Sequence, residues 1–281
     1  MVKSKLKLDF VAIGPQRTGT TWLYQALADH PQLCFPKGVK ETMFFDRFYE
    51  KGLSWYEAHF QHGNEGQKYG EIAPTYFDTE TIPAKIYKLN PHCKIIINLR
   101  HPLERILSVY RHYISLGEIK PDFDQAIESH PHLINAGRYS YYIPYWLKTF
   151  DQENICFILL EEIQTQPQTV LRKLENFLDI SEIKFSTENQ EKVNAATIPK
   201  FPLLAKGFTQ LARFLRENRL HGIVELGKKF GLRKVYTGGE DKMPTLTQEQ
   251  QNFLLELYEP DTVYIEKLLG LSLSRWREIN E

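Results

Sequence analysis

Residues 8–30 read LDFVAIGPQRTGTTWLYQALADH, and the architecture follows from this segment. Its first seven residues are an apolar run of the length of a buried strand, ending in glycine. From residue 21 onward the apolar side chains recur at the spacing of one helix face. The segment therefore predicts a strand, a short polar loop and a helix in direct succession.

The loop, GPQRTGTT at residues 14–21, is close to the nucleotide-binding pattern G-x-x-x-x-G-K-[S/T]. Both glycines match, and Thr21 stands at the hydroxyl position. The glycines let successive backbone N–H groups turn inward, and the positive end of the following helix lies beside them. The loop therefore predicts a binding site for a phosphate or a sulfate.

The loop departs from that pattern at Thr20, which stands where nucleotide hydrolases carry their lysine. Those enzymes also need a magnesium-binding aspartate after a later strand. Here the loop's charge is on Arg17, and the apolar run 93–99 is followed by Arg100. These differences disfavour a P-loop nucleotide kinase and favour an anion site that works without a metal.

Two further strand-and-helix units follow the first. The run 93–99 leads into a helical pattern at 102–116, and the run 155–160 leads into another at 167–180. Alternation of apolar strands with helices is typical of a parallel sheet covered by helices. We predict an α/β fold, a P-loop-like parallel sheet flanked by helices.

The chain shows no linker-like stretch, so we expect one domain over residues 1–281, with its core at about 9–180. From about residue 200 to 281 the pattern is helical and amphipathic, with one expected break at Pro260. The sequence therefore predicts a helical C-terminal extension.

Charge and composition narrow the function. Lys and Arg total 35 and Asp and Glu total 35, so the chain lacks the field of a general nucleic-acid binder. An anionic ligand must then be held by a local cluster of cations, which we expect around 17–21, 100–108 and 200. Three separated cysteines indicate reduced thiols of a cytoplasmic protein, and the absence of a long apolar run predicts no membrane span.

Arg100 and Ser108 predict a second anion site. Arg100 follows a buried strand, at the sheet edge where open α/β folds bind ligands. Ser108 lies one or two turns into the next predicted helix, so both can reach one phosphate. The alternative is a surface salt bridge for Arg100 and a helix serine without a ligand. Two anion sites at two strand ends imply one ligand with two separated anionic groups.

GPQRTGTTWL and LRHPLERILSVY closely resemble the sulfotransferases that use 3′-phosphoadenosine 5′-phosphosulfate (PAPS). The second segment matches the family pattern R-x-P-x-x-R-x-x-S-x-Y at every position, and the resemblance covers about residues 9–180. It implies that the loop holds the 5′-phosphosulfate and that Arg100 and Ser108 hold the 3′-phosphate. The donor-binding residues that the resemblance implies are Arg17, Thr18, Gly19, Thr20, Thr21, Trp22, Arg100 and Ser108.

The resemblance also implies the chemistry: metal-independent, in-line transfer of a sulfuryl group to a hydroxyl or amine of a carbohydrate or small-molecule acceptor. GVKETMFFD resembles glucosaminyl sulfotransferases, whose glutamate acts as the base, and this makes Glu41 the candidate base. His112 and His59 are competing bases, and the alternative for Glu41 itself is a loop glutamate paired with Lys37 or Lys40. Arg17 is expected to stabilise the departing phosphate, where the family more often has a lysine.

A second departure from the family lies in GEIAPTYFD, where Ile72 replaces the lysine of glucosaminyl members. We expect an acceptor cleft shaped by the aromatic residues Trp22, Phe44, Phe45 and Tyr76, and a contribution of Lys200 to the 3′-phosphate or adenine site. The alternatives are a P-loop-type kinase and a catalytically inactive nucleotide- or glycan-binding module. Membrane-anchored relatives begin with a helix not seen here, so we expect a bacterial-like, cytoplasmic enzyme.

Overall fold

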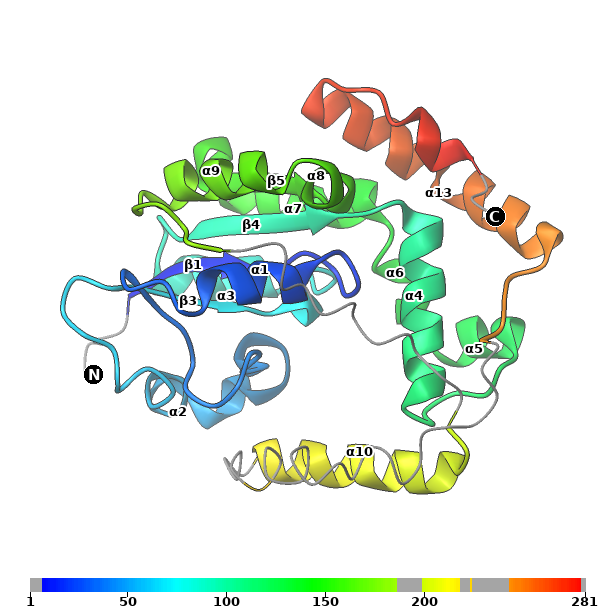
Figure 1. Cartoon of the computed structure of the whole chain (residues 1–281), viewed down its shortest axis with the longest axis horizontal. Coiled ribbons are helices and arrows are strands. Elements are labelled where there is room, and N and C mark those ends of the chain that lie inside the picture. The colour runs from blue at the N-terminus through cyan, green and yellow to red at the C-terminus, as the bar shows by residue number, and fades with distance from the viewer. Residues whose placement is uncertain (1–6, 186–198, 218–222, 224–242, 279–281) are drawn as a thin grey trace.

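The computed structural model describes residues 7–185, 199–217, 223 and 243–278 (Figure 1). Within them, a five-stranded parallel sheet has the order β2-β3-β1-β4-β5. The strands are β1 (Leu8–Ala12), β2 (Leu33–Cys34), β3 (Lys68–Ile72), β4 (Lys94–Leu99) and β5 (Ile155–Leu159). The central strand is therefore β1, which leads into the glycine-containing loop.

Helices cover both faces of this sheet and extend beyond it (Figure 1). They are α1 (Thr20–Leu27), α2 (Leu53–Glu57), α3 (Ile82–Leu89), α4 (Pro102–Ser115), α5 (Phe123–Ser129), α6 (His132–Asn135), α7 (Tyr139–Thr149), α8 (Leu160–Thr165), α9 (Pro167–Leu178), α10 (Pro202–Glu217) and α13 (Gln248–Leu269). Short helical turns lie at Phe44–Phe48, Tyr49–Lys51, Pro74–Tyr76, Gln152–Asn154 and Ser274–Arg277.

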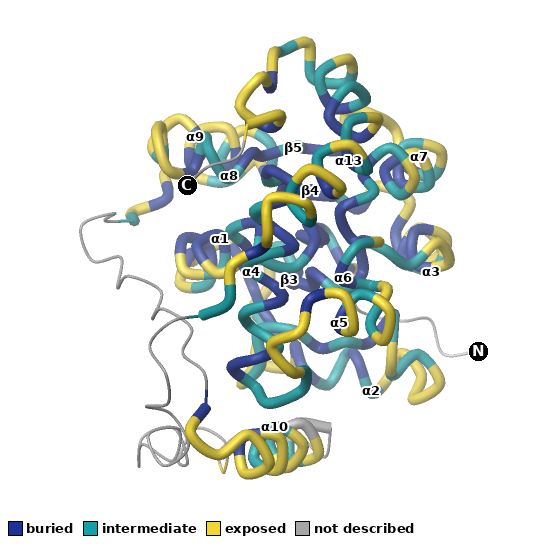
Figure 2. The backbone as a smooth tube through the Cα atoms, turned by 90° about the vertical axis from the view of Figure 1, so that its right-hand side faces the viewer, coloured by how far each residue is buried: buried dark blue, intermediate teal, exposed yellow. Residues whose placement is uncertain are grey.

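The core has one layer on each face of the sheet. Val11 and Ile95 pack with residues of α3 and α7 on one face, while Phe10 and Ile96 pack with α1 and α9 on the other. Because successive residues of a strand point to opposite faces, continuous apolar runs bury both sides. Figure 2 shows this buried centre, and it shows α10 as largely exposed.

The predicted α/β architecture is confirmed. All three strand-and-helix units form where the sequence places them, as β1–α1, β4–α4 and, at 155–178, β5–α9 with the short α8 between. The sequence analysis missed β2 and β3. β3 reads KYGEI and lacks a continuous apolar run, because its Glu71 is buried through hydrogen bonds rather than through apolar contact.

The predicted break at Pro260 is wrong, because α13 runs from Gln248 to Leu269 with Pro260 inside it. Tertiary contacts hold this helix: Asp261 is fully buried and accepts from Ser140 N at 2.7 Å and from its Oγ at 2.6 Å. Packing of this kind offsets the backbone hydrogen bond that proline removes. Residues 218–222 and 224–242 of the predicted extension lie outside the described part.

The three cysteines are buried and free, as expected of packed thiols: Cys34, Cys93 and Cys156. Among the described residues, no helix combines the length and the apolarity needed to cross a membrane.

Candidate active site

The loop between β1 and α1 is held in a tight, partly left-handed conformation. Arg17 has φ 74° and Gly19 has φ 93°. Gly14 lies against β4, where a Cβ would come within 2.3 Å of Asn98 N, so glycine is required for this approach. The Thr18 hydroxyl donates to the Pro15 carbonyl at 2.7 Å and closes the turn.

Gly19 is the N-cap of α1 and has no side chain with which to cap it. The N–H groups of the first helical turn therefore stay available to an external acceptor, and the helix dipole adds positive potential there. The geometry is that of an anion cradle, as the loop sequence predicts.

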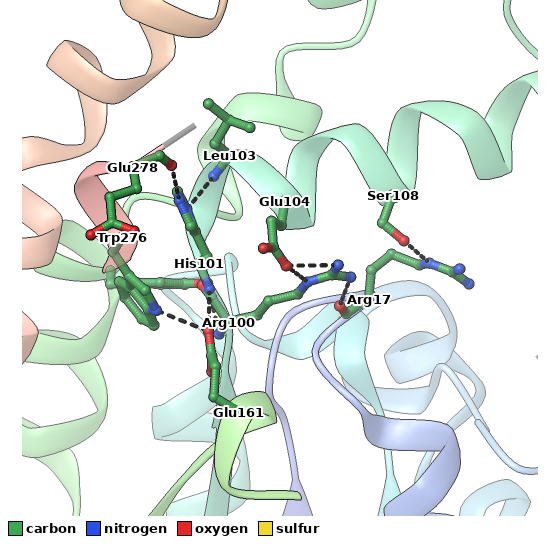
Figure 3. Close-up of polar contacts among 10 residues, drawn as sticks. Arg17, Arg100, His101, Leu103, Glu104, Ser108, Glu161, Trp276 and Glu278 are labelled. Atoms are coloured by element: carbon green, nitrogen blue, oxygen red, sulfur yellow. Dashed lines mark hydrogen bonds and ion pairs between the residues drawn. The ribbon is translucent and has the colours of Figure 1, made fainter. Parts of the chain in front are cut away.

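The two predicted anion sites meet through direct contacts (Figure 3). Arg17 Nε donates to Ser108 Oγ at 2.9 Å, and Arg100 Nη1 donates to the Arg17 carbonyl oxygen at 3.2 Å. Burial lowers the pKa of Arg17, and the neighbouring Arg100 lowers it further. Two guanidinium groups and a hydroxyl, from the loop, the residue after β4 and α4, thus converge on one region.

Glu104 pairs with Arg100 in this structure. Its Oε2 accepts from Arg100 Nε at 3.2 Å and from Nη2 at 3.0 Å. The fork of Arg100 is therefore already engaged by a carboxylate one helical turn away. An incoming phosphate would have to compete with that carboxylate.

The C-terminal segment supports the turn that follows Arg100 (Figure 3). His101 Nε2 is 3.3 Å from the Glu278 carbonyl oxygen, and its Nδ1 accepts from Leu103 N at 3.3 Å. Trp276 stacks on His101 and donates from Nε1 to Glu161 Oε1 at 2.9 Å. Residues far apart in the chain thereby fix the start of α4.

The candidate base Glu41 lies on the segment between β2 and the turn at Phe44–Phe48. Its Oε1 is 3.4 Å from Lys40 Nζ, and the same ammonium is 3.4 Å from Thr20 Oγ1. Glu41 is thus tied, through one neighbouring side chain, to the first residue of α1.

Glu71 of β3 anchors the segment that carries Glu41 through hydrogen bonds with Thr42. It is fully buried, and its Oε2 accepts from Thr42 Oγ1 at 2.6 Å and from Thr42 N at 3.3 Å. Its Oε1 accepts from Tyr56 OH at 2.9 Å and from Tyr76 OH at 3.0 Å. Burial raises the pKa of Glu71 to about 7, although these hydrogen bonds favour the ionised form.

The loop, Arg100, Ser108 and Glu41 border one cavity of about 800 Å³, a size typical of small-molecule sites. Its polar lining includes Arg17, Thr20, Thr21, Lys40, Glu41, Arg47, His59, Arg100, Ser108, His112 and Glu118. The lining thus holds four arginine or lysine side chains and two carboxylates. This excess of cations is the local cluster that a chain without net charge needs for an anionic ligand.

The model of the sulfotransferase domain family matches residues 7–201 of the chain. The chain belongs to this family. The resemblance drawn from the loop and from the R-x-P-x-x-R-x-x-S-x-Y segment is therefore confirmed.

Two curated relatives illustrate the match of this chain. The bifunctional heparan sulfate N-deacetylase/N-sulfotransferase 1 of Caenorhabditis elegans is 32% identical over 196 residues, covering 64% of the chain and 23% of the relative. The mouse heparan sulfate glucosamine 3-O-sulfotransferase 3A1 is 31% identical over 183 residues, covering 62% and 46%. The chain therefore spans less than half the length of these relatives.

A solved structure shares the fold over nearly the whole molecule. The sulfotransferase from Alicyclobacillus acidocaldarius superposes with a TM-score of 0.69 at 19% identity, covering 97% of this chain and 100% of that one. At this identity the match supports the fold, including the C-terminal helical part, and no more than the fold.

Most predicted site residues of the sulfotransferase do border the cavity. They are Arg17, Gly19, Thr20, Thr21, Trp22, Glu41, Arg100 and Ser108, together with the competing bases His59 and His112. Thr18 is fully buried, and its side chain serves the loop itself. Lys200 is exposed, with its ammonium 5.7 Å from the centre of the Phe201 ring, and it is not among the described residues that line the cavity.

Three aromatic residues expected in the acceptor cleft lie in the core instead. Phe44, Phe45 and Tyr76 are fully buried in the cluster beneath the cavity. The lining aromatics are Trp22, Phe48, Trp55 and Tyr113. Phe44 and Phe45 pack inward because large aromatic side chains gain most from the burial of their apolar area.

Sequence reasoning named Lys40 only as an alternative partner of Glu41, and it assigned no site role to Arg47, Glu71 or Glu104. Two of them carried a usable signal: Lys40 adjoins the candidate base, and Glu104 stands four residues after Arg100, the spacing of a helical ion pair. Glu71 matches the first residue of the E-K-x-P-x-Y-F segment of glucosaminyl members, whereas Arg47 gave no signal and is brought to the cavity only by the tertiary structure.

Proposed function

We propose that this sulfotransferase moves the sulfuryl group of PAPS to a hydroxyl or amine of a glycan or small-molecule acceptor. The observation that carries the proposal is the convergence of Arg17, Arg100 and Ser108 beside the anion cradle, with Glu41 on the same cavity. A donor with a 5′-phosphosulfate and a 3′-phosphate presents two anionic groups to two such sites.

In the proposed complex, the loop amides and the start of α1 bind the 5′-phosphosulfate. Arg100 and Ser108 bind the 3′-phosphate, a charge-assisted contact of the kind that arginine makes well. The phosphate then replaces the Glu104 carboxylate on Arg100 and accepts a hydrogen bond from the Ser108 hydroxyl. Arg17 turns from Ser108 toward the departing 5′-phosphate.

The transfer is an in-line displacement at sulfur. The acceptor oxygen or nitrogen forms the new bond to sulfur while the bond from sulfur to the 5′-phosphate oxygen breaks. Glu41 takes the proton of the acceptor, and adenosine 3′,5′-bisphosphate (PAP) leaves. Arg17 and the N–H groups of α1 stabilise the negative charge that develops on the phosphate.

A carbohydrate acceptor is supported by the glucosaminyl-type relatives, whose names carry heparan sulfate. Part of the cavity wall offers aromatic surface at Phe48 and Trp55 and a cation at Arg47. Such a wall suits a ring that presents both an apolar face and polar edges. Ile72 supplies no cation here, so the charge at the reaction centre must come from other side chains.

The test combines binding with transfer. Calorimetry should detect PAP binding to the purified chain, and radiolabelled PAPS should sulfate at least one of de-N-sulfated heparin, chitosan oligosaccharide and 4-nitrophenol. Absence of PAP binding would overturn the proposal. Tight PAP binding without transfer to any acceptor would support the inactive binding module, and magnesium-dependent ATP binding would support the kinase.

We further propose that residues 1–281 act as one domain and that the enzyme is cytoplasmic and of bacterial type. Three free, buried cysteines support a reducing compartment. The helical part from α13 onward supports one domain, since Asp261 and Trp276 both pack against the sheet domain. Limited proteolysis should then release no stable fragment that ends between α9 and α10.

A further inference from the structure

The ammonium of Lys40 lies beside the loop residue that stands in place of a lysine. In G-x-x-x-x-G-K-[S/T], the lysine position corresponds to Thr20, and Lys40 Nζ is 3.4 Å from Thr20 Oγ1. The two residues are 20 positions apart, so Lys40 approaches from the segment that follows β2. The tertiary structure thus places a lysine amine beside the anion-binding loop, although the loop itself contains no lysine.

Lys40 also contacts the candidate base. Its Nζ is 3.4 Å from Glu41 Oε1, and its side chain is 24% exposed. Burial lowers the pKa of Lys40, Arg17 lowers it further, and Glu41 opposes both. The charged groups that face this ammonium are therefore Arg17 from the loop and Glu41 from its own segment.

We propose that Lys40 is a catalytic residue, which donates a proton to the 5′-phosphate oxygen that departs from sulfur. This inference rests on the proposed sulfuryl transfer. Neither Arg17 nor Ile72 can take this role, because a guanidinium stays protonated and isoleucine carries no proton to give. Among the residues that line the cavity, Lys40 is the one whose amine lies at the start of α1.

The protons balance through the contact of Lys40 with Glu41. Glu41 takes a proton from the acceptor as the new bond to sulfur forms. Lys40 gives a proton to the phosphate oxygen as the bond from sulfur to that oxygen breaks. Transfer of the proton from Glu41 to Lys40 then restores both groups, so the net movement is one proton from the acceptor to PAP.

The experiment compares Lys40→Arg, which keeps the charge, with Lys40→Met, which removes it. Lys37→Met is the matched control, because Lys37 is exposed on the same segment and outside the described lining of the cavity. Calorimetry gives PAP affinity, thermal unfolding checks the fold, and single-turnover transfer from PAPS to the best acceptor of the panel gives the rate. The pH profile of that rate from pH 6 to pH 10 is the fourth readout.

We expect both Lys40 variants to bind PAP within about tenfold of the unmodified enzyme and to lose about 10²–10⁴-fold in transfer rate, the range of general acid–base catalysis. The unmodified enzyme should lose rate at alkaline pH as Lys40 deprotonates, and Lys40→Arg should remove that limb. Lys37→Met should behave as the unmodified enzyme.

A Lys40→Arg enzyme that transfers at full rate would overturn the assignment of the proton to Lys40. So would a Lys40→Arg enzyme whose rate still falls at the same alkaline pH as that of the unmodified enzyme. So would loss of PAP affinity alone, which would make Lys40 a binding residue. In these cases the unmodified enzyme still transfers sulfate, and the proposed function stands. An unmodified enzyme that neither binds PAP nor transfers sulfate would overturn both proposals.

Discussion

Arg17 and Ser108 are joined by a hydrogen bond of 2.9 Å across 91 positions of the chain. Arg17 belongs to the loop after β1, and Ser108 belongs to α4, which follows β4. Because β1 and β4 are neighbours in a parallel sheet, their carboxyl ends lie together. This bond joins the two proposed phosphate sites.

Replacement of Arg100 by alanine should weaken PAP binding by about 10- to 100-fold. A hydrogen bond to a charged group contributes about 1.5–3 kcal/mol, and Arg100 would supply the charge for the 3′-phosphate. Calorimetric titration with PAP measures the effect. Arg172→Ala, an exposed change on α9, is the control and should bind normally. Unchanged affinity of Arg100→Ala would place the 3′-phosphate elsewhere.

Replacement of Glu104 by alanine should strengthen PAP binding, by up to about fivefold. Its carboxylate occupies Arg100 at 3.0 Å, and a partly exposed pair of this kind contributes about 0.2–1 kcal/mol. Removal of the competitor frees the guanidinium for phosphate. The same titration serves as the measurement, with Glu128→Ala on the exposed side of α5 as the control. A weaker complex would mean that Glu104 orients Arg100 rather than competing for it.

Replacement of Glu41 by glutamine should lower the transfer rate by about 10²–10⁴-fold while PAP affinity is kept. Glutamine retains the shape of the side chain but cannot accept the acceptor's proton. His59→Asn and His112→Asn distinguish the competing bases, since both histidines line the cavity. The base is whichever residue lowers the single-turnover rate by this factor, and a fully active Glu41→Gln enzyme would exclude Glu41.

Glu71 should make folding stability depend on pH. Its pKa rises from 4.5 to about 7 on burial, so the folded state holds the proton more tightly than the unfolded state. The free energy of unfolding should therefore fall as the pH rises from about 4.5 to 7, by about 3 kcal/mol from this group. Urea unfolding at several pH values measures the slope.

Glu71→Gln is the matched variant for that measurement. Its unfolding free energy should vary less between pH 4.5 and 7 than that of the unmodified enzyme. The difference between the two isolates Glu71 from Asp46, Asp78 and Asp261, whose pKa values burial also raises. Equal slopes would show that the four hydrogen bonds of Glu71 keep it ionised throughout.

Short-range pattern was sufficient for β1, β4 and β5 and for the helices after them. The strands are continuous apolar runs, as burial on both faces of the sheet requires, and the helices repeat their apolar residues along one face. The pattern failed for β3, where Glu71 is satisfied by hydroxyls of Thr42, Tyr56 and Tyr76. It failed again at Pro260, where tertiary contacts hold the helix together.

The sequence by itself determined the family and the sheet with its flanking helices, and it predicted Arg17, Arg100, Ser108 and Glu41 as site residues. These follow from residues close together in the chain, where spacing and local conformation are coupled. Only the tertiary structure decided that Lys40 contacts Thr20 and that Phe44 and Phe45 lie in the core. Side-chain contacts between distant segments depend on packing and on the pairing of buried charge, and neither has a fixed period in sequence.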